Sequence, residues 1–327
     1  MVTHELPGMG IPSLTGQVKL APVARQVESL RSTGVEVDVL EVKGSKGIKY
    51  LQCLSRLRTL ASKVDLIHAH YGFCGWVARG QFGKPVVVSF MGSDLLGGKD
   101  ANGRVGLFRQ FEVRTNKWLA RTVDMAIVKS AEMANVIKGA RVHIIPNGVD
   151  LELFRPMCPS AARAALGWSE DKIYVLFPSS PDIPGKGFDL ACAVIADTSR
   201  HLTRTLELVP LGNVPPNRVP LYMNGCHALL MTSFSEGSPN VVKEAMACNL
   251  PVVSVPVGDV PELLAGVREC TVCPRNVQML SEALVKALVN NRRADGRSAI
   301  ERKGLSMMDV ARRIKSIYEG VLALRSD

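Results

Sequence analysis

Short runs of β-type apolar residues alternate with helical patterns along the whole chain, and this rhythm constrains the fold more than any other feature. Strands separated by segments long enough for crossover helices pair in parallel, and the helices cover both faces of the sheet. The sequence therefore predicts two doubly wound α/β domains. The strand candidates are "VEVDVLEV" (35–42), "VDLIHAH" (64–70), "KPVVVSF" (84–90), "VDMAIVKS" (123–130) and "VHIIPNG" (142–148), then "KIYVLFPSS", "TLELVPLGNV", "HALLMTS", "PVVSVPV" and "CTVCP".

Chain length supports two domains. At 327 residues the chain exceeds the usual size of one core, so two domains of about 150 residues are expected. We predict one Rossmann-like domain over 1–150 and a second over 151–327, joined near "NGVDLELFRP", where Phe154 can anchor the linker. The first strand should be reduced to little more than "MVT", as after a late start codon. Parallel sheets bind ligands at the carboxyl ends of their strands, so two facing domains predict an interdomain cleft.

Composition narrows the class of protein. With 46% hydrophobic and 21% charged residues, no apolar run near the roughly 20 residues of a membrane span, and no signal peptide, a cytoplasmic protein is expected. The eight cysteines are scattered and suit small buried hydrophobes. The pair in "CTVC" (270–273) lacks a second pair nearby, so no metal site is expected.

The positive charge is concentrated in the first half of the chain. Lys plus Arg outnumber Asp plus Glu by 21 to 13 in residues 1–158, and by 19 to 17 in the remainder. Two basic segments, "YLQCLSRLRTLASKV" and "RVGLFRQFEVRTNKWLAR", lie in that half. Such helices usually pack their apolar stripe on their own sheet, and peripheral contact with an anionic membrane is the alternative. Nucleic-acid binding is not expected, because no aromatic platform or known motif accompanies the charge.

Two glutamates flank a predicted helix start in "FSEGSPNVVKEAMACNLPVVS" (234–254). Ser238 suits the N-cap and Pro239 the first helical position, and a helix start at the end of a strand can bind a phosphate through free amides. Lys186, in "PGKGF", can reach the same anion. Glu244 lies about 7 to 8 Å along the helix axis, where it can accept from sugar hydroxyls, while Glu236 accepts from a second sugar. Ordinary surface carboxylates are the alternative.

The spacing from Glu236 to Glu244, together with "NGVDLELFRP", "GKGFDL", "LGNVPPNRVPLYMNGCHALLMTS" and "NLPVVSVPVGDVPELL", resembles the retaining glycosyltransferases of family 4. The resemblance covers nearly the whole chain. It implies the GT-B fold, which consists of two Rossmann-like domains facing a cleft, and leaves open that a C-terminal helix crosses back to the first domain. It also implies a nucleotide diphosphate sugar as donor substrate, with no metal and no other cofactor.

The resemblance also implies roles for individual residues. Glu244 would bind the ribose, Glu236 the transferred sugar, and Lys186 the diphosphate. The expected catalytic residues are Glu236, Lys186 and His70. The expected donor-binding residues are Gly8, Gly10, Asn213, Val214, Ser238, Pro239, Asn240 and Glu244, and Met91 and Asp94 are expected on the acceptor side.

Two departures from the family pattern bear on these roles. No arginine precedes Lys186 in "FPSSPDIP", and Met91 stands where members often have a histidine. His70 is the nearest substitute for that histidine. Strand periodicity puts His68 and His70 on one face, so either can be a core histidine; we expect this for His68 and expect His70 to line the cleft. Asp94 can simply cap the segment that follows it.

The implied function is the transfer of a hexose-type sugar to a glycan or a lipid-linked acceptor at the inner face of a bacterial-type membrane, in glycan, cell-envelope polysaccharide or glycolipid biosynthesis. A non-catalytic or weakly hydrolytic nucleotide-sugar-binding protein is the alternative. A nicotinamide-dependent oxidoreductase is disfavoured, because "GMGIPSLTG" lacks the glycine spacing of the dinucleotide fingerprint. A glycosidase would not need a diphosphate site at a helix start.

Overall fold

The computed structural model describes residues 1–4, 21–43, 48–98 and 105–325. Its contacts divide the chain into two compact units. Unit 1 takes in Met1–Gly98, Val105–Gly148 and Met307–Asp327, and unit 2 takes in Val149–Ser306. The division falls two residues before the predicted one, and the last helix is grouped with unit 1 instead of with the predicted range 151–327. Among the described residues, none of the helices combines the length and apolarity that crossing a bilayer would need.

Unit 1 contains a sheet of six parallel strands in the order β2-β1-β3-β4-β5-β6. Each of the five predicted runs contains a strand, and the predicted short first strand is β1. The ladder between the first two strands pairs Val2 with Leu40, so residues 35–39 of the predicted run lie before it. The strands are β1 (Val2–His4), β2 (Leu40–Val42), β3 (Ile67–His70), β4 (Val86–Ser89), β5 (Met125–Val128) and β6 (Val142–Ile144).

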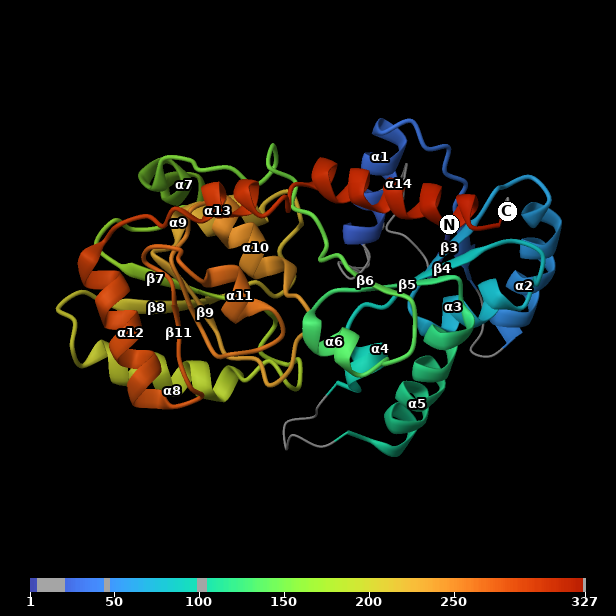
Figure 1. The fold of residues 1–327 in the computed structure, drawn as a ribbon. Coiled ribbons are helices and arrows are strands. Elements are labelled where there is room, and N and C mark those ends of the chain that lie inside the picture. The colour runs from blue at the N-terminus through green and yellow to red at the C-terminus, as the bar shows by residue number, and fades with distance from the viewer. Residues whose placement is uncertain (5–20, 44–47, 99–104, 326–327) are drawn as a thin grey trace. The chain divides into compact units, whose positions relative to one another are not determined.

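Helices cover both faces of this sheet (Figure 1). α2 and α5 each pack on α3, and α14 packs on α1. α14 faces the core because Val310, Ile314, Ile317 and Val321 recur at helical spacing and are all buried. The helices of unit 1 are α1 (Ala21–Ser32), α2 (Ile48–Ala61), α3 (Gly72–Arg79), α4 (Ser93–Leu96), α5 (Leu107–Thr122), α6 (Ala131–Asn135) and α14 (Met307–Ala323).

Unit 2 contains a sheet of five parallel strands in the order β11-β10-β9-β7-β8. α8 and α12 pack together on one side, and α7 with α9 and α10 with α13 form pairs on the other (Figure 1). The strands are β7 (Ile173–Phe177), β8 (Leu206–Pro210), β9 (Ala228–Met231), β10 (Val252–Ser254) and β11 (Thr271–Val272). The helices are α7 (Pro159–Leu166), α8 (Phe188–Ser199), α9 (Val219–Gly225), α10 (Asn240–Ala247), α11 (Val260–Leu264), α12 (Val277–Asn290) and α13 (Gly296–Arg302).

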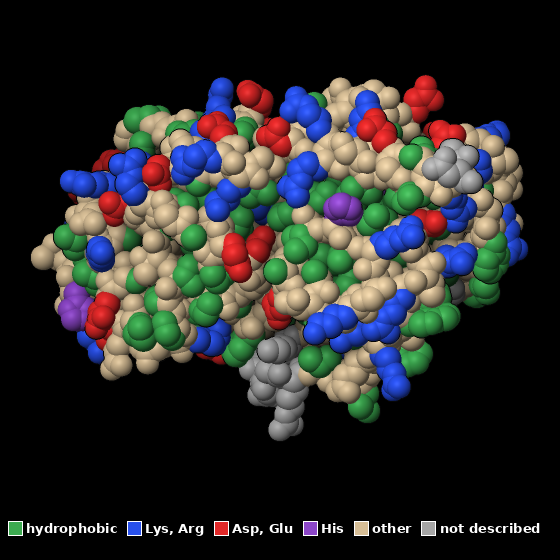
Figure 2. All heavy atoms as spheres, viewed as in Figure 1, with side chains coloured by type: hydrophobic (Ala, Val, Ile, Leu, Met, Phe, Trp, Pro, Cys, Tyr) green, Lys and Arg blue, Asp and Glu red, His purple; other side chains and the backbone are tan. Residues whose placement is uncertain are grey.

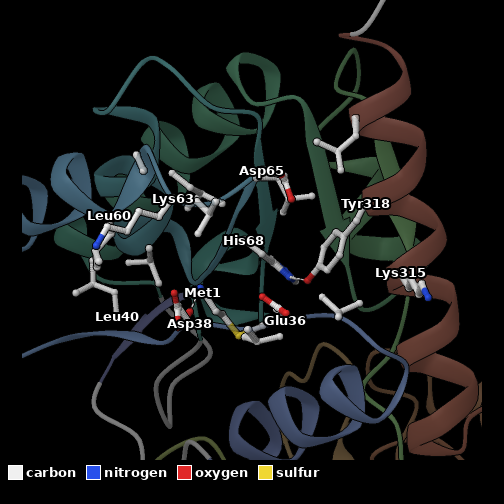
Figure 3. A pocket seen from close by; sticks show the side chains of 18 of the residues that line it. Met1, Glu36, Asp38, Leu40, Leu60, Lys63, Asp65, His68, Lys315 and Tyr318 are labelled. Carbon is white, nitrogen blue, oxygen red and sulfur yellow. Dashed lines mark hydrogen bonds between the residues drawn. The ribbon is translucent and has the colours of Figure 1, made fainter.

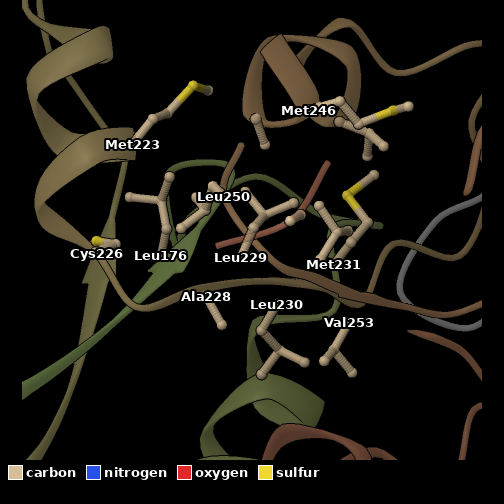
Figure 4. Packing of buried hydrophobic residues seen from close by; sticks show 14 of the residues in the cluster. Leu176, Met223, Cys226, Ala228, Leu229, Leu230, Met231, Met246, Leu250 and Val253 are labelled. Atoms are coloured by element: carbon tan, nitrogen blue, oxygen red, sulfur yellow. The ribbon is translucent and has the colours of Figure 1, made fainter. Parts of the chain in front are cut away.

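The central strand β9 is apolar on both sides because both of its faces are covered. All four of its residues are buried. Figure 4 shows Leu229 and Met231 on the side of the sheet where Met246 lies, and Leu230 beside Val253 on the other side. Phe154 is buried in the same core, as predicted for the residue that anchors the linker.

Each sheet contains one point where the strand order reverses. In unit 2 the chain passes from β7 to β8 on one side, and then returns to β9 on the other side of β7. In unit 1 the same reversal lies between β1 and β3. The crossover loops separate at such a point and leave a crevice beyond the carboxyl ends of the two strands, which is where open α/β sheets bind ligands.

Candidate functional site

The candidate site of unit 2 is formed by the loops that follow β7 and β9, which flank the strand-order reversal. Lys186 lies in the first loop and Glu236 in the second. The Lys186 ammonium donates to a Glu236 carboxylate oxygen at 2.6 Å, and the two side chains are 32% and 16% exposed. The structure thus brings together two of the predicted catalytic residues. A half-buried pair of this kind keeps a carboxylate acceptor and a cation next to one another while both remain open to a ligand.

Backbone contacts hold these two loops together. The Phe234 amide donates to the Gly185 carbonyl at 2.9 Å, and the Thr232 hydroxyl donates to the Gly187 carbonyl at 2.9 Å. Gly187 has a left-handed φ of 72°, and a Cβ there would lie 2.2 Å from the Thr232 carbonyl oxygen. Only glycine therefore lets the lysine loop approach the end of β9 this closely.

We expect Gly187→Ala to destabilise the protein by about 2 kcal/mol more than Gly167→Ala does, because backbone must move to relieve the clash. Gly167 is a matched control, since its φ of 70° is similar and nothing lies within 4 Å of its added Cβ. Urea unfolding of both variants measures the difference. Equal losses of stability would show that the close approach of the two loops contributes nothing.

Arg275 is a site residue that the sequence analysis missed. It lies in the loop between β11 and α12, donates to the carbonyls of Thr232 and Ser233, and stacks its guanidinium 3.5 Å from the centre of the Phe234 ring. It thus adds a second cation at the lysine loop, although no arginine precedes Lys186 in the sequence. Nothing in "CPRN" distinguishes this arginine from an ordinary exposed one.

The start of α10 differs from the prediction. The N-cap position is Pro239, not Ser238, and α10 begins at Asn240. No side chain caps this helix start, and the Ser238 hydroxyl instead accepts a hydrogen bond from the Lys243 ammonium at 2.9 Å. Glu244 is the fifth residue of α10 and is half-buried.

Lys243 is a second residue that the sequence analysis missed, because a lysine in a helix pattern normally indicates a solvent-facing position. Its side chain is fully buried, and burial lowers its pKa to about 8 against the opposing effect of Asp259 and Glu244. Burial also raises the pKa of Asp259, whereas Lys243 and the Ser238 hydroxyl act in the opposite direction. Lys243 and Asp259 thus both interact with Ser238, the residue directly before the N-cap position of α10.

The loops after β8 and β10 flank the site on either side. Asn213 follows β8, has a left-handed φ of 60° and is exposed, and the half-buried Val214 comes next. A Cβ on the neighbouring Gly212 would lie 3.2 Å from Ser180 in the lysine loop. After β10, a Cβ on Gly258 would lie 2.4 Å from the Gly237 carbonyl oxygen. The predicted donor-binding residues described in unit 2 therefore lie on adjoining loops or on the adjoining helix α10.

In unit 1, His68 and His70 lie at the end of β3 and stack with ring centres 4.6 Å apart. His68 is a satisfied core histidine, as predicted, because its two nitrogens contact the Tyr318 hydroxyl at 2.5 Å and the Ser89 hydroxyl at 2.8 Å. His70 is fully buried, and its ring nitrogens have no hydrogen-bond partner among the described residues. Burial lowers its pKa to about 3, and Lys129 adds to the effect.

Asp94 anchors the loop after β4. Its buried carboxylate accepts from the amides of Met91 at 3.0 Å and Gly92 at 2.9 Å. Burial raises the pKa of Asp94 to about 6, against the lowering effect of those hydrogen bonds. These contacts support the structural role that the sequence left open for Asp94. Gly8 and Gly10 lie outside the described residues.

A cavity of about 520 Å³ lies elsewhere in unit 1. Figure 3 shows His68, Tyr318 and Lys315 on one side of it, and Met1 and Asp38 on another. It is lined by the residues that precede β2 and β3, so it opens at the amino-terminal edge of the sheet. The predicted site residues follow the carboxyl ends of strands, and the cavity is therefore separate from them.

Two family models match the chain. Residues 24–153 match glycosyltransferase family 4, and residues 171–290 match the glycosyl transferases group 1 model. D-inositol 3-phosphate glycosyltransferase of Mycobacterium avium is 29% identical over 68% of this chain and 61% of its own length. The same enzyme of Mycolicibacterium paratuberculosis is 30% identical over 68% of this chain and 58% of its own length, so the chain spans about three fifths of these relatives.

Solved structures show the same fold. Sucrose-phosphate synthase from Thermosynechococcus elongatus superposes with a TM-score of 0.76 at 17% identity, covering 99% of both chains. HepE from Anabaena, in complex with UDP, superposes with a TM-score of 0.73 at 18% identity, covering 98% of both chains. The chain therefore belongs to the family-4 type of glycosyltransferases, with two parallel-sheet, Rossmann-like domains of the GT-B fold.

Proposed function

We propose that the protein is a retaining glycosyltransferase that moves a hexose-type sugar from a nucleoside diphosphate sugar to a hydroxyl of a glycan or a lipid-linked acceptor. The observation that carries the proposal is the Lys186–Glu236 pair at the strand-order reversal of unit 2, beside the start of α10. A cation and the backbone amides of a helix start suit a diphosphate, and the two glutamates suit hydroxylated rings.

In this proposal the donor lies along the carboxyl edge of the second sheet. The backbone amides of Ser238 and Asn240 contribute to the diphosphate site together with Lys186. Pro239, between them, has no amide hydrogen and lines the site through its backbone only. Glu244 accepts from the ribose hydroxyls, and the backbone at Asn213 and Val214 lines the base pocket. Arg275 adds positive charge beside the lysine loop, so the departing diphosphate is stabilised without a metal.

For the chemical step we propose a front-face displacement through an oxocarbenium-like transition state. The bond from the anomeric carbon to the diphosphate oxygen breaks, the acceptor oxygen attacks from the same face, and its proton passes to the leaving oxygen. Glu236 orients the transferred sugar and stabilises the positive charge on its ring. The protein then contributes orientation and charge placement more than covalent chemistry. Met91 of unit 1 is proposed to lie on the acceptor side, in the loop that the buried Asp94 carboxylate holds. His70, expected as a catalytic residue, is fully buried and is given no contact with the substrate in this proposal.

Donor binding tests this proposal without knowledge of the acceptor. We expect one of UDP-glucose, GDP-mannose and ADP-glucose to raise the melting temperature most, and the solved complex of HepE with UDP-glucose makes the uridine nucleotide the first choice. A ligand at 100 times its Kd stabilises the folded state by about 2.7 kcal/mol.

Glu244→Ala should remove most of this shift and leave the melting temperature of the free protein nearly unchanged, because Glu244 is only half-buried. Glu282→Ala, at an exposed position on α12, is the matched control and should keep the full shift. The donor assignment fails if no sugar nucleotide changes the melting temperature. Hydrolysis of the bound donor in the absence of acceptor would separate an enzyme from a non-catalytic binding protein.

A further inference from the structure

The outward face of α5 is apolar, which is unusual for a solvent-facing helix surface. Leu107, Phe111 and Trp118 are 84%, 66% and 58% exposed. Their spacing of four and seven residues places them on one side of the helix. The opposite side carries the buried residues Glu112, Asn116, Leu119 and Ala120. α5 therefore packs on the core like an ordinary surface helix, but its outward side also carries large apolar side chains.

The charge on this outward face has one sign. Arg114, Lys117 and Arg121 lie along the same side of α5 as the apolar residues, at helical spacing from them. The one acidic residue of α5 is Glu112, whose buried carboxylate pairs with Arg109 at 2.6 Å. The exposed side of α5 is thus aromatic and basic, without an acid.

Neighbouring elements continue the same character. α2 and α5 both pack on α3, so their outer surfaces belong to one side of unit 1. Ile48 and Leu51 of α2 are exposed, and α2 contains Lys49, Arg56 and Arg58 but no acid. Figure 2 shows Lys, Arg and hydrophobic side chains over the region where Figure 1 places α5.

Local packing does not account for the exposed aromatic residues. Trp118 stacks on Trp76 of α3, with ring centres 5.1 Å apart, and yet remains more than half exposed. Phe82, in the loop after α3, lies 5.6 Å from the Arg79 guanidinium and is also exposed. Aromatic residues beside Lys and Arg favour the interface of an anionic bilayer, where the rings enter the headgroup layer and the cations meet lipid phosphates. A second copy of this surface would instead bring like charges together.

We propose that the outward face of α5, continued by the exposed face of α2, binds the surface of an anionic lipid bilayer. The contact is peripheral: the aromatic side chains insert at the level of the headgroups, and the arginines and lysines hold the phosphates around them. This inference goes beyond the proposed transferase activity and does not depend on it.

Cosedimentation of the full chain with vesicles tests the proposal. We expect binding to vesicles of phosphatidylglycerol and phosphatidylcholine, little binding to vesicles of phosphatidylcholine alone, and loss of binding at high salt, because exposed charges are then screened. Equal binding to both kinds of vesicle, or to neither, would overturn it.

Two double variants locate the surface. Arg114→Gln with Arg121→Gln should weaken the partition coefficient by about 5-fold for each charge removed. Phe111→Ser with Trp118→Ser should weaken binding by at least about 10-fold through loss of apolar insertion. The matched controls are Val289→Ser and Arg292→Gln, which change an exposed apolar and an exposed basic residue of unit 2 and should bind like the unchanged protein.

A further measurement distinguishes a bilayer from a second copy of the chain. Sedimentation velocity over a range of protein concentrations tests whether the chain associates with itself through this surface. We expect the double variants to have the same association state as the unchanged protein. If the unchanged protein self-associates and the double variants do not, or if both double variants bind vesicles as the unchanged protein does, the bilayer assignment is wrong. The donor-induced rise in melting temperature should persist in both double variants, so failure here is separable from failure of the proposed activity.

Discussion

Glu236→Gln is expected to lower kcat/KM for sugar transfer by about 10² to 10³-fold, the usual cost of removing one electrostatic contact with the transition state. Glutamine keeps the size of the side chain but loses the negative charge that would stabilise an oxocarbenium-like ring. Folding should change little, because the Lys186 side chain left without its partner is 32% exposed and can be solvated.

The matched control is Glu207→Gln. Glu207 also pairs with a lysine, since the Lys172 ammonium lies 3.2 Å from its carboxylate, but the pair lies on the edge strand β8. Initial rates at varied donor and acceptor concentration would show a loss of turnover for Glu236→Gln and none for Glu207→Gln. Rates for Glu236→Gln within threefold of the unchanged protein would remove Glu236 from the proposed mechanism.

The strands could be predicted from the sequence because a parallel strand covered on both faces must be apolar along its length. β7 and β9 are buried at every position, and their apolar runs stand out from the flanking loops. β2 was less well predicted. The run "VEVDVLEV" alternates from residue 35, but the ladder with β1 begins at Leu40, opposite Val2. Alternation indicates a tendency to form a strand, whereas the ladder also requires a partner strand.

The same contrast applies to the candidate site. Lys186 and Glu236 could be predicted because strand-end loops meet at one edge of a parallel sheet, so two loops distant in sequence must adjoin. Lys243 and Arg275 could not. A helical pattern does not show which way the Lys243 side chain turns, and the contact of Arg275 with Phe234 joins residues 41 positions apart. Their burial and contacts depend on tertiary packing, which local patterns do not report.

A large pH effect on stability is expected from His70. Its pKa is about 3 in the folded protein, and about 6.5 is usual in an unfolded chain. Between these values the unfolded chain binds a proton that the folded protein excludes, so the free energy of unfolding falls as the pH falls below 6.5. By pH 4.5 this one histidine should cost about 3 kcal/mol of stability, and at pH 7 it should cost almost nothing.

Substitution by leucine, which has a similar volume and does not titrate, isolates this contribution from those of other groups. At pH 7, His70→Leu should be as stable as the unchanged protein or more so, because the ring nitrogens of the buried His70 have no hydrogen-bond partner among the described residues. Urea unfolding at pH 7 and pH 4.5 should show that His70→Leu loses about 3 kcal/mol less on acidification than the unchanged protein does. His201→Leu, at an exposed position, is the control and should lose as much as the unchanged protein. If His70→Leu behaves like this control, His70 is not held neutral by burial, and the lowered pKa is wrong.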